Sequence, residues 1–415
     1  MSMQVRNKGL GIRHLQALLL LSAIFIQFIM RFSISISIVA MTNFCKSSPA
    51  NSVEFKWTNS EINYVLGGFF WGFTLTQFPG SYLTRLYGVK LILFVSVFGS
   101  SLFALITPFC IPFGGWKLFC GIRICQGIFQ GLLYPCVYNH LSNWSPVEER
   151  NILGGIALSG QESGALVAMF GSGLIASSSI GWPGIYYISA TFGVIFCFLW
   201  MIFASNSPLE SNWITYHEQN YILSSLDKSE VGGNMKKIPV PWKSILTSIP
   251  FWALLVSACS ESFGMTIFEA QIPSYLNGVL SLDINKNGLY SSLGYLAMWL
   301  MGFVNLFISI FLLKKKVLTL TSVRRTFNTI ALWLPAVGFI GIGFLDKEQK
   351  VEAVILLIIM MGLHLGTTIG SSLNNLDLAP NHAGVLVGMI NTIASGIAIV
   401  SPLTVGLIVD DKVSP

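Results

Sequence analysis

The chain has 415 residues, of which 53% are hydrophobic and only 10% are charged, and its formal net charge is +6. A soluble domain has about 25% charged residues, so this composition excludes an ordinary soluble globular protein. The basic residues lie mostly in the loops between apolar runs, which indicates membrane topology and not a nucleic-acid interface. No nucleophile–base arrangement, metal-ligand spacing or phosphate-binding glycine loop stands out, so we expect no enzyme, no cofactor and no metal site.

Apolar runs of roughly 20 residues, the length that crosses a bilayer, recur along the whole chain. Such runs form helices, because a backbone in lipid must satisfy its own hydrogen bonds. We therefore predict an all-α, multi-pass membrane protein with eleven spans. The spans are expected at residues 15–41, 62–83, 89–110, 115–140, 152–178, 183–204, 250–278, 288–313, 325–345, 352–374 and 384–409.

The distribution of basic residues predicts the orientation of these spans. If the N-terminus is cytoplasmic, fifteen of the 24 Lys and Arg residues fall on the cytoplasmic side and seven on the opposite side. Cytoplasmic loops of membrane proteins carry such an excess of positive charge. We therefore expect a cytoplasmic N-terminus.

Two of the first four spans contain an arginine. Arg31 lies well inside the first span, and Arg123 lies about six residues, or roughly 9 Å of helix, beyond the start of its apolar run at Lys117. An arginine at membrane depth costs at least about 2.5–3.5 kcal/mol, so a chain retains one only with a partner or a task. Two interpretations are open: contact with a substrate anion, or an ion pair with Glu162 or Glu261 that holds helices together.

The fifth span combines the acid Glu162 with several glycines, at positions 160, 164, 171 and 173. Small residues let helices in a membrane approach closely. We expect packing at these glycines, with a hinge as the alternative.

A polar stretch at 205–249 separates six spans from five. We predict a six-helix half at 1–204, a cytoplasmic linker at 205–249, and a second half at 250–415 with five of its six helices. Two six-helix halves are the plan of the major facilitator superfamily. Because the twelfth span is missing, we expect a C-terminal truncation of the sequence.

The later spans add Glu261 and Glu269 in the seventh and His364 in the tenth. In the major facilitator fold the first, fourth, seventh and tenth helices line a central cavity, so these residues are expected to meet Arg31 and Arg123. Two guanidinium groups there would hold an anion through their forks of donors. Ionised acids would repel that anion, which predicts a coupling cation or proton. His364 is either packed or involved in binding or proton transfer.

Two motifs carry a resemblance to a known family. RICQGIFQGLLYP at 123–135 and NWSPVEER at 143–150 resemble the fourth-helix signature of the anion:cation symporters, solute carrier family 17. That family includes sodium-dependent phosphate, vesicular glutamate and sialic acid transporters. FFWGFTLTQFPGSYLTRLYGVK at 69–90 and NNLDLAPNHAGVLVGMIN at 374–391 also match it, and the likeness is greatest to the phosphate cotransporter type of insects.

The resemblance implies substrate and coupling residues. Arg31 and Arg123 fall on the family's anion-binding arginines, and we add Gln130 and His364 to the expected substrate contacts. Gln130 replaces a glutamate that is associated with proton coupling in the vesicular and lysosomal members, and the phosphate and urate type similarly has glutamine there. Coupling is therefore expected at Glu261, Glu269 and Glu162 instead. At two positions the sequence departs from the glutamate transporters: Leu66 replaces a histidine, and Glu261 replaces an arginine.

The resemblance also implies a function. We expect a monomeric secondary active transporter in the plasma membrane that moves a small anion, inorganic phosphate or an organic anion, by alternating access. Its expected partners are that anion, a coupling cation (sodium or a proton) and the lipid bilayer, and membrane potential is an alternative driving force. The alternative function is a truncated, non-transporting relative that acts as a sensor or partner protein.

Overall fold

The computed structural model describes residues 9–42, 55–176, 178–226, 240–278, 284–345 and 349–408. Within these ranges only the backbone is described at 267–291 and 400–408. The described chain is helical, with no strand in it. This confirms the all-α prediction.

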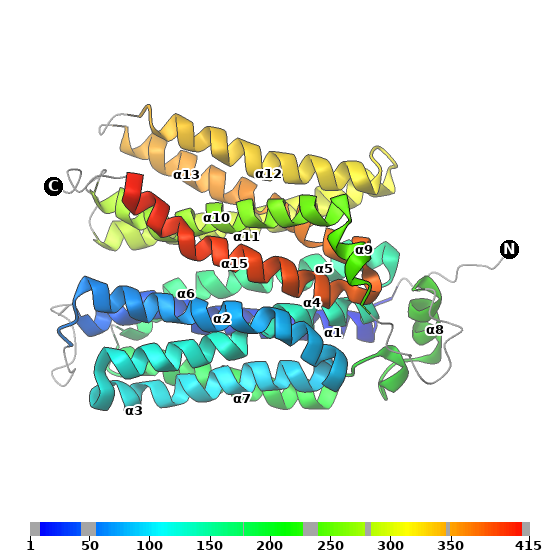
Figure 1. Cartoon of the computed structure of the whole chain (residues 1–415), viewed down its shortest axis with the longest axis horizontal. Coiled ribbons are helices and arrows are strands. Elements are labelled where there is room, and N and C mark those ends of the chain that lie inside the picture. Colours follow the sequence, from blue (N-terminus) through cyan, green and yellow to red (C-terminus); the bar gives the residue numbers. More distant parts are fainter. Residues whose placement is uncertain are drawn as a thin grey trace.

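The first seven helices form one group, which we call the α1–α7 group; it is the lower layer in Figure 1. Every span predicted before residue 205 is matched, to within two residues at its end, by one of these helices or by two in succession. The helices are α1 (Ile12–Thr42), α2 (Asn59–Tyr87), α3 (Val89–Gln130), α4 (Leu133–Trp144), α5 (Arg150–Leu158), α6 (Gly160–Ala176) and α7 (Trp182–Phe203), with a short 3-10 turn η1 (Val147–Glu149) before α5.

The last helices form a second group, the α10–α15 group, which lies above the first in Figure 1. It consists of α10 (Ile249–Gly278), α11 (Ile284–Lys314), α12 (Leu320–Ile342), α13 (Lys350–His364), the π-helical turn η3 (Thr368–Ser372), α14 (Asn374–Leu378), η4 (Pro380–His382) and α15 (Ala383–Ile408). Between the groups run η2 (Pro208–Glu210), α8 (Tyr216–Ser225) and α9 (Trp242–Leu246). The start of α1, α8 and α9 lie at one end of the bundle, the linker end.

The breaks between helices follow the sequence closely. Within α3 the backbone leaves the helical region at Gly115, where φ is +55°, and Pro108 and Pro112 lie just before it. Glycine adopts a positive φ without the steric cost of a side chain. The break therefore falls where the predicted spans 89–110 and 115–140 meet.

Glycines bring helices of the α1–α7 group into backbone contact. A Cβ atom on Gly127 of α3 would lie 2.1 Å from the carbonyl oxygen of Phe69 in α2, and one on Gly164 of α6 would lie 2.6 Å from that of Phe25 in α1. A Cβ on Gly173 would meet nothing within 4 Å. Close packing thus accounts for Gly164, and the contact at Gly127 fixes where Phe69 lies against α3.

The outside of the bundle suits a membrane. Phe113, Phe198 and Trp333 are 91%, 70% and 70% exposed, and large apolar surfaces of this kind mark membrane or partner contact. Seven stretches of the described chain are long and apolar enough to cross a bilayer: Ile12–Ile38, Val89–Trp144, Val147–Ala176, Trp182–Phe203, Ser292–Lys314, Leu320–Ile342 and Val351–Leu378. This supports the prediction of a multi-pass membrane protein.

Candidate functional site

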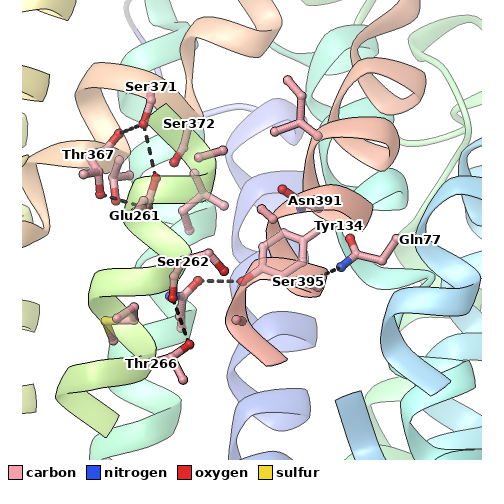
Figure 2. A pocket seen from close by; sticks show the side chains of 18 of the residues that line it. Gln77, Tyr134, Glu261, Ser262, Thr266, Thr367, Ser371, Ser372, Asn391 and Ser395 are labelled. Carbon is pink, nitrogen blue, oxygen red and sulfur yellow. Dashed lines mark hydrogen bonds between the residues drawn. The ribbon is translucent and has the colours of Figure 1, made fainter. Parts of the chain in front are cut away.

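A central cavity of about 200 Å³ lies between the two groups of helices. Side chains from α1, α2, α4 and α6 line one side, and side chains from α10, α13, η3 and α15 line the other (Figure 2). Its wall is mixed, with aromatic rings, hydroxyls and amides beside a few ionisable groups. The ionisable residues in the wall, apart from two tyrosines, are Arg31, Glu162, Glu261 and His364.

Arg31 brings the positive charge into this cavity. Its guanidinium carbon lies between 5.1 and 5.7 Å from the centres of five phenylalanine rings: Phe28, Phe32, Phe69, Phe70 and Phe73. The electron-rich faces of aromatic rings attract a cation at such distances. No ion pair to Arg31 occurs in the part of the chain that the structure describes. Its donors are therefore not neutralised by a carboxylate.

Arg123 is close to Arg31 but does not line the cavity. Its side chain is 3% exposed, its Nη1 donates to Gln126 Oε1 at 3.0 Å, and its Nε finds no acceptor among the described residues. Its guanidinium carbon lies 4.9 Å from the Phe69 ring, the same ring that Arg31 contacts at 5.2 Å. One phenylalanine thus contacts both arginines.

Of the two other predicted substrate contacts, one lines the cavity and one does not. His364 lines the cavity from α13. Gln130 does not: it is 2% exposed, and its Nε2 has no partner among the described residues. Of the predicted coupling acids, Glu269 lies in α10, but its side chain is outside the described part of the structure.

The two described acids approach the cavity from opposite groups. Glu261 of α10 accepts hydrogen bonds from the Thr367 hydroxyl at 2.9 Å and the Ser371 hydroxyl at 3.3 Å (Figure 2). Glu162 of α6 is 5% exposed. The four ion pairs of the described residues involve neither acid, so the interpretation in which Arg31 or Arg123 pairs with one of them is not supported.

Comparison with known families identifies the family of the chain that forms this cavity. The model of the Major Facilitator Superfamily matches residues 20–402. The chain belongs to this superfamily. A Drosophila ananassae protein provisionally named an inorganic phosphate cotransporter is 31% identical over 94% of this chain and 84% of its own length. Human sialin is 29% identical over 94% of this chain and 82% of its own length. These relatives confirm the predicted resemblance to solute carrier family 17.

A solved structure supports the fold independently. The proton:xylose symporter XylE aligns with a TM-score of 0.69 at 14% identity, covering 96% of this chain and 88% of its own. At that identity the likeness concerns the fold alone. The family match and the transporter relatives make the protein a major facilitator transporter and not an enzyme, as predicted.

Neutral polar residues of the transporter cavity were largely missed by sequence reasoning. The Tyr134 hydroxyl of α4 donates to Gln161 Oε1 of α6 at 2.6 Å, and Gln77 Nε2 of α2 donates to the Ser395 hydroxyl of α15 at 3.1 Å (Figure 2). Asn391 of α15 lies beside them. The only sequence signal was a hydroxyl or amide inside an apolar run, which is too common to single out these residues.

Ion pairs join the two groups of the transporter at the linker end. Asp377 of α14 accepts from Arg150 of α5 at 3.1 Å and from Arg324 of α12 at 2.7 Å. Arg324 also donates to Asn151 Oδ1 at 2.7 Å. Both arginines are among the fifteen basic residues assigned to the cytoplasmic side by the predicted topology. The structure shows that they also connect α5 with α12 and α14.

Proposed function

We propose that the transporter moves a small anion, inorganic phosphate or an organic anion, by alternating access. The observation that carries this proposal is Arg31, a guanidinium in the central cavity with no carboxylate bound to it in the described part of the chain. Guanidinium groups bind carboxylate and phosphate oxygens in a bidentate manner. The names of the relatives, a phosphate cotransporter and sialin, support the same class of substrate.

Neutral donors complete the proposed anion site. Tyr134, Gln77 and Asn391 lie in the cavity wall with Arg31 and offer hydroxyl and amide groups. They add hydrogen bonds without adding charge, as is usual where a few polar groups fix a ligand's orientation. His364 is proposed as a further contact from the opposite group.

Arg123 and Gln130 are proposed to act in another state of the transport cycle. Both are buried beside the cavity and outside its wall. The Phe69 ring contacts Arg31 and Arg123 alike, so a rearrangement of this ring would bring the second guanidinium toward the anion.

The charges of the cavity support coupling to a cation. When Glu162 and Glu261 are both ionised, their two negative charges exceed the single positive charge of Arg31. A cavity wall with this net negative charge repels an anion. Two ligands are coupled when the binding of one changes the affinity for the other. A cation bound between the acids and the anion would couple them in this way, because it removes the repulsion between the carboxylates and the anion. We propose sodium as the coupling cation, with Glu269 as a third candidate acid, and membrane potential as the alternative driving force.

The setting of the transporter is proposed from charge and family. The excess of basic residues on one side supports a cytoplasmic N-terminus, which would put the linker end in the cytoplasm. We propose the plasma membrane as its location and a monomer as its functional form.

Uptake into proteoliposomes tests the proposal. Purified protein is reconstituted, and a sodium gradient, a pH gradient and a membrane potential are imposed separately while phosphate, urate and small carboxylates are offered in turn. We expect at least one anion to accumulate, most strongly with the sodium gradient. Binding without uptake of any anion would contradict transport and favour the sensor function instead.

A further inference from the structure

A second, much smaller cavity lies beside the first between the two groups of helices. Its volume is about 20 Å³, and residues of α5, α6, α11 and η3, together with Ser159 and Leu365, surround it. A cavity of roughly 10–15 Å³ on this scale holds one water molecule. The space therefore accommodates one or two atoms the size of a water oxygen and excludes a polyatomic anion.

The two cavities share part of their walls. Leu158, Glu162, Leu365 and Thr368 line both of them. The two polar members of this shared wall come from opposite groups, Glu162 from α6 and Thr368 from η3. A ligand between these two side chains would touch both groups and the anion cavity at once.

Glu162 has no counter-charge among the described residues. It is 5% exposed, its carboxylate accepts a hydrogen bond from its own backbone N–H, and no ion pair of the described residues involves it. A buried carboxylate in a membrane protein is costly unless a counter-charge accompanies it. Among the residues that surround the small cavity it is the sole ionisable one.

The oxygen atoms around Glu162 suit a hard cation. The Ser159 hydroxyl donates its proton to the Ile156 carbonyl oxygen at 2.8 Å, which leaves its lone pairs for a ligand. Thr368 adds a second hydroxyl at the first residue of the π-helical turn η3. Such π-turns are rare and frequently occur at functional sites.

We infer that Glu162, Thr368 and Ser159 bind one small monovalent cation, of the size of sodium, in this second cavity. One carboxylate balances one positive charge, whereas a divalent cation would leave a charge uncompensated in a low-dielectric site. The inference rests on the proposed function, because it names the place where the coupling cation binds. A cation there neutralises the acid in the wall of the anion cavity and bridges the two groups.

Thermal unfolding of the full chain in lipid nanodiscs tests the site. Sodium chloride is titrated against choline chloride at constant pH and ionic strength, and the unfolding temperature is recorded. A ligand that binds the folded state raises this temperature in a saturable manner. We expect a sodium-dependent rise for the wild type, its loss in Glu162→Gln and its weakening in Thr368→Val.

Glu352→Gln serves as the control, because it removes an exposed acid from the first turn of α13 and should keep the sodium-dependent rise. Glu261→Gln discriminates between the two cavities, because Glu261 lines only the larger one. If sodium binds in the smaller cavity, the rise persists in this variant. If Glu162→Gln proves too unstable to purify, Thr368→Val and the sodium-dependent fluorescence change of Trp299, identified with Trp299→Phe, decide the question.

The outcomes separate this inference from the proposed function. An unchanged sodium effect in Glu162→Gln, or stabilisation that follows pH alone, would overturn the cation site. Loss of the effect in Glu261→Gln but not in Glu162→Gln would move it to the larger cavity and also overturn it. Anion uptake without any sodium binding contradicts the cation site and sodium coupling but leaves anion transport standing, and sodium binding without uptake contradicts only the proposed transport.

Discussion

At the scale of the residue, Arg31 combines two properties that rarely occur together. It is a cation in the interior of a membrane protein, and among the described residues it contacts phenylalanine rings and forms no ion pair with an acid. A cation–π contact contributes about 0.5–1 kcal/mol at an exposed site and about 2 kcal/mol or more when desolvated, and it uses none of the N–H donors in a charge-assisted hydrogen bond. The residue is stabilised and yet remains able to donate to an anion.

Arg31→Lys is the variant that separates charge from geometry. Lysine keeps the positive charge but loses the planar fork, so a bidentate anion loses one charge-assisted hydrogen bond. We expect anion uptake at low substrate concentration to fall by about tenfold, equal to roughly 1.4 kcal/mol. Arg325→Lys, at an exposed position of α12, should be unchanged. Wild-type uptake in Arg31→Lys would exclude bidentate binding.

At the scale of the element, the contact between α2 and α3 places Phe69 against Arg123. The backbones touch at Gly127, where an added Cβ would lie 2.1 Å from the Phe69 carbonyl oxygen. Backbone atoms cannot move aside as a flexible side chain does. The two helices would have to separate to admit even a methyl group.

Gly127→Ala is therefore expected to destabilise the transporter strongly. Overpacking typically costs about 1–3 kcal/mol, and a clash with backbone belongs at the upper end of that range. Gly121→Ala in the same helix is the matched control, because a Cβ there meets nothing within 4 Å. Unfolding temperatures of both variants in detergent measure the difference. Equal temperatures would show that α2 and α3 do not pack as described.

The ion pairs of Asp377 at the linker end lead to a second prediction at this scale. Asp377→Asn leaves the two arginines that bind it, each with a side chain 5% exposed, without their carboxylate. Removing one partner of a buried ion pair costs about 3–5 kcal/mol. We expect faster hydrogen exchange in α5 and α14, measured by mass spectrometry, with Glu352→Gln as the control. Exchange at wild-type rates would show that Asp377 does not hold these helices together.

At the scale of the whole molecule, alternating access requires the two groups to separate at the linker end during each cycle. A Cβ atom built on Gly384 of α15 would lie 3.2 Å from the Cβ of Asn139 in α4. Disulfide-bonded cysteines have Cβ atoms about 3.5–4.5 Å apart, so this pair needs only a small adjustment.

The double variant Asn139→Cys/Gly384→Cys is expected to form a disulfide that locks the linker end. Uptake should stop under oxidising conditions and return after reduction, while the single-cysteine variants and the oxidised wild type keep transporting. Full uptake by the cross-linked protein, with the bond verified by mass spectrometry, would contradict movement of the two groups at this end.

Much of the architecture was predictable, because length and apolarity determine where a membrane helix forms and glycine and proline mark where it breaks. The helix rotations were not predictable to the same degree. Arg31, Glu261 and His364 face the cavity as expected, but Arg123 and Gln130 lie outside its wall. A small rotation of a helix moves a side chain out of a cavity, and packing such as that at Gly127 sets this rotation. The domain boundaries at 1–204, 205–249 and 250–415 stay a prediction.

The phenylalanine cage around Arg31 has a consequence for selectivity. An anion that reaches the guanidinium meets phenylalanine rings of α1 and α2 beside it, so it gives up part of its hydration shell on arrival. That loss is more costly for a compact, strongly hydrated ion than for one whose charge is spread over a larger frame. Delocalised organic carboxylates should therefore be favoured over phosphate, in the order of their ease of dehydration. The discrimination between anions would then depend on side chains that carry no charge.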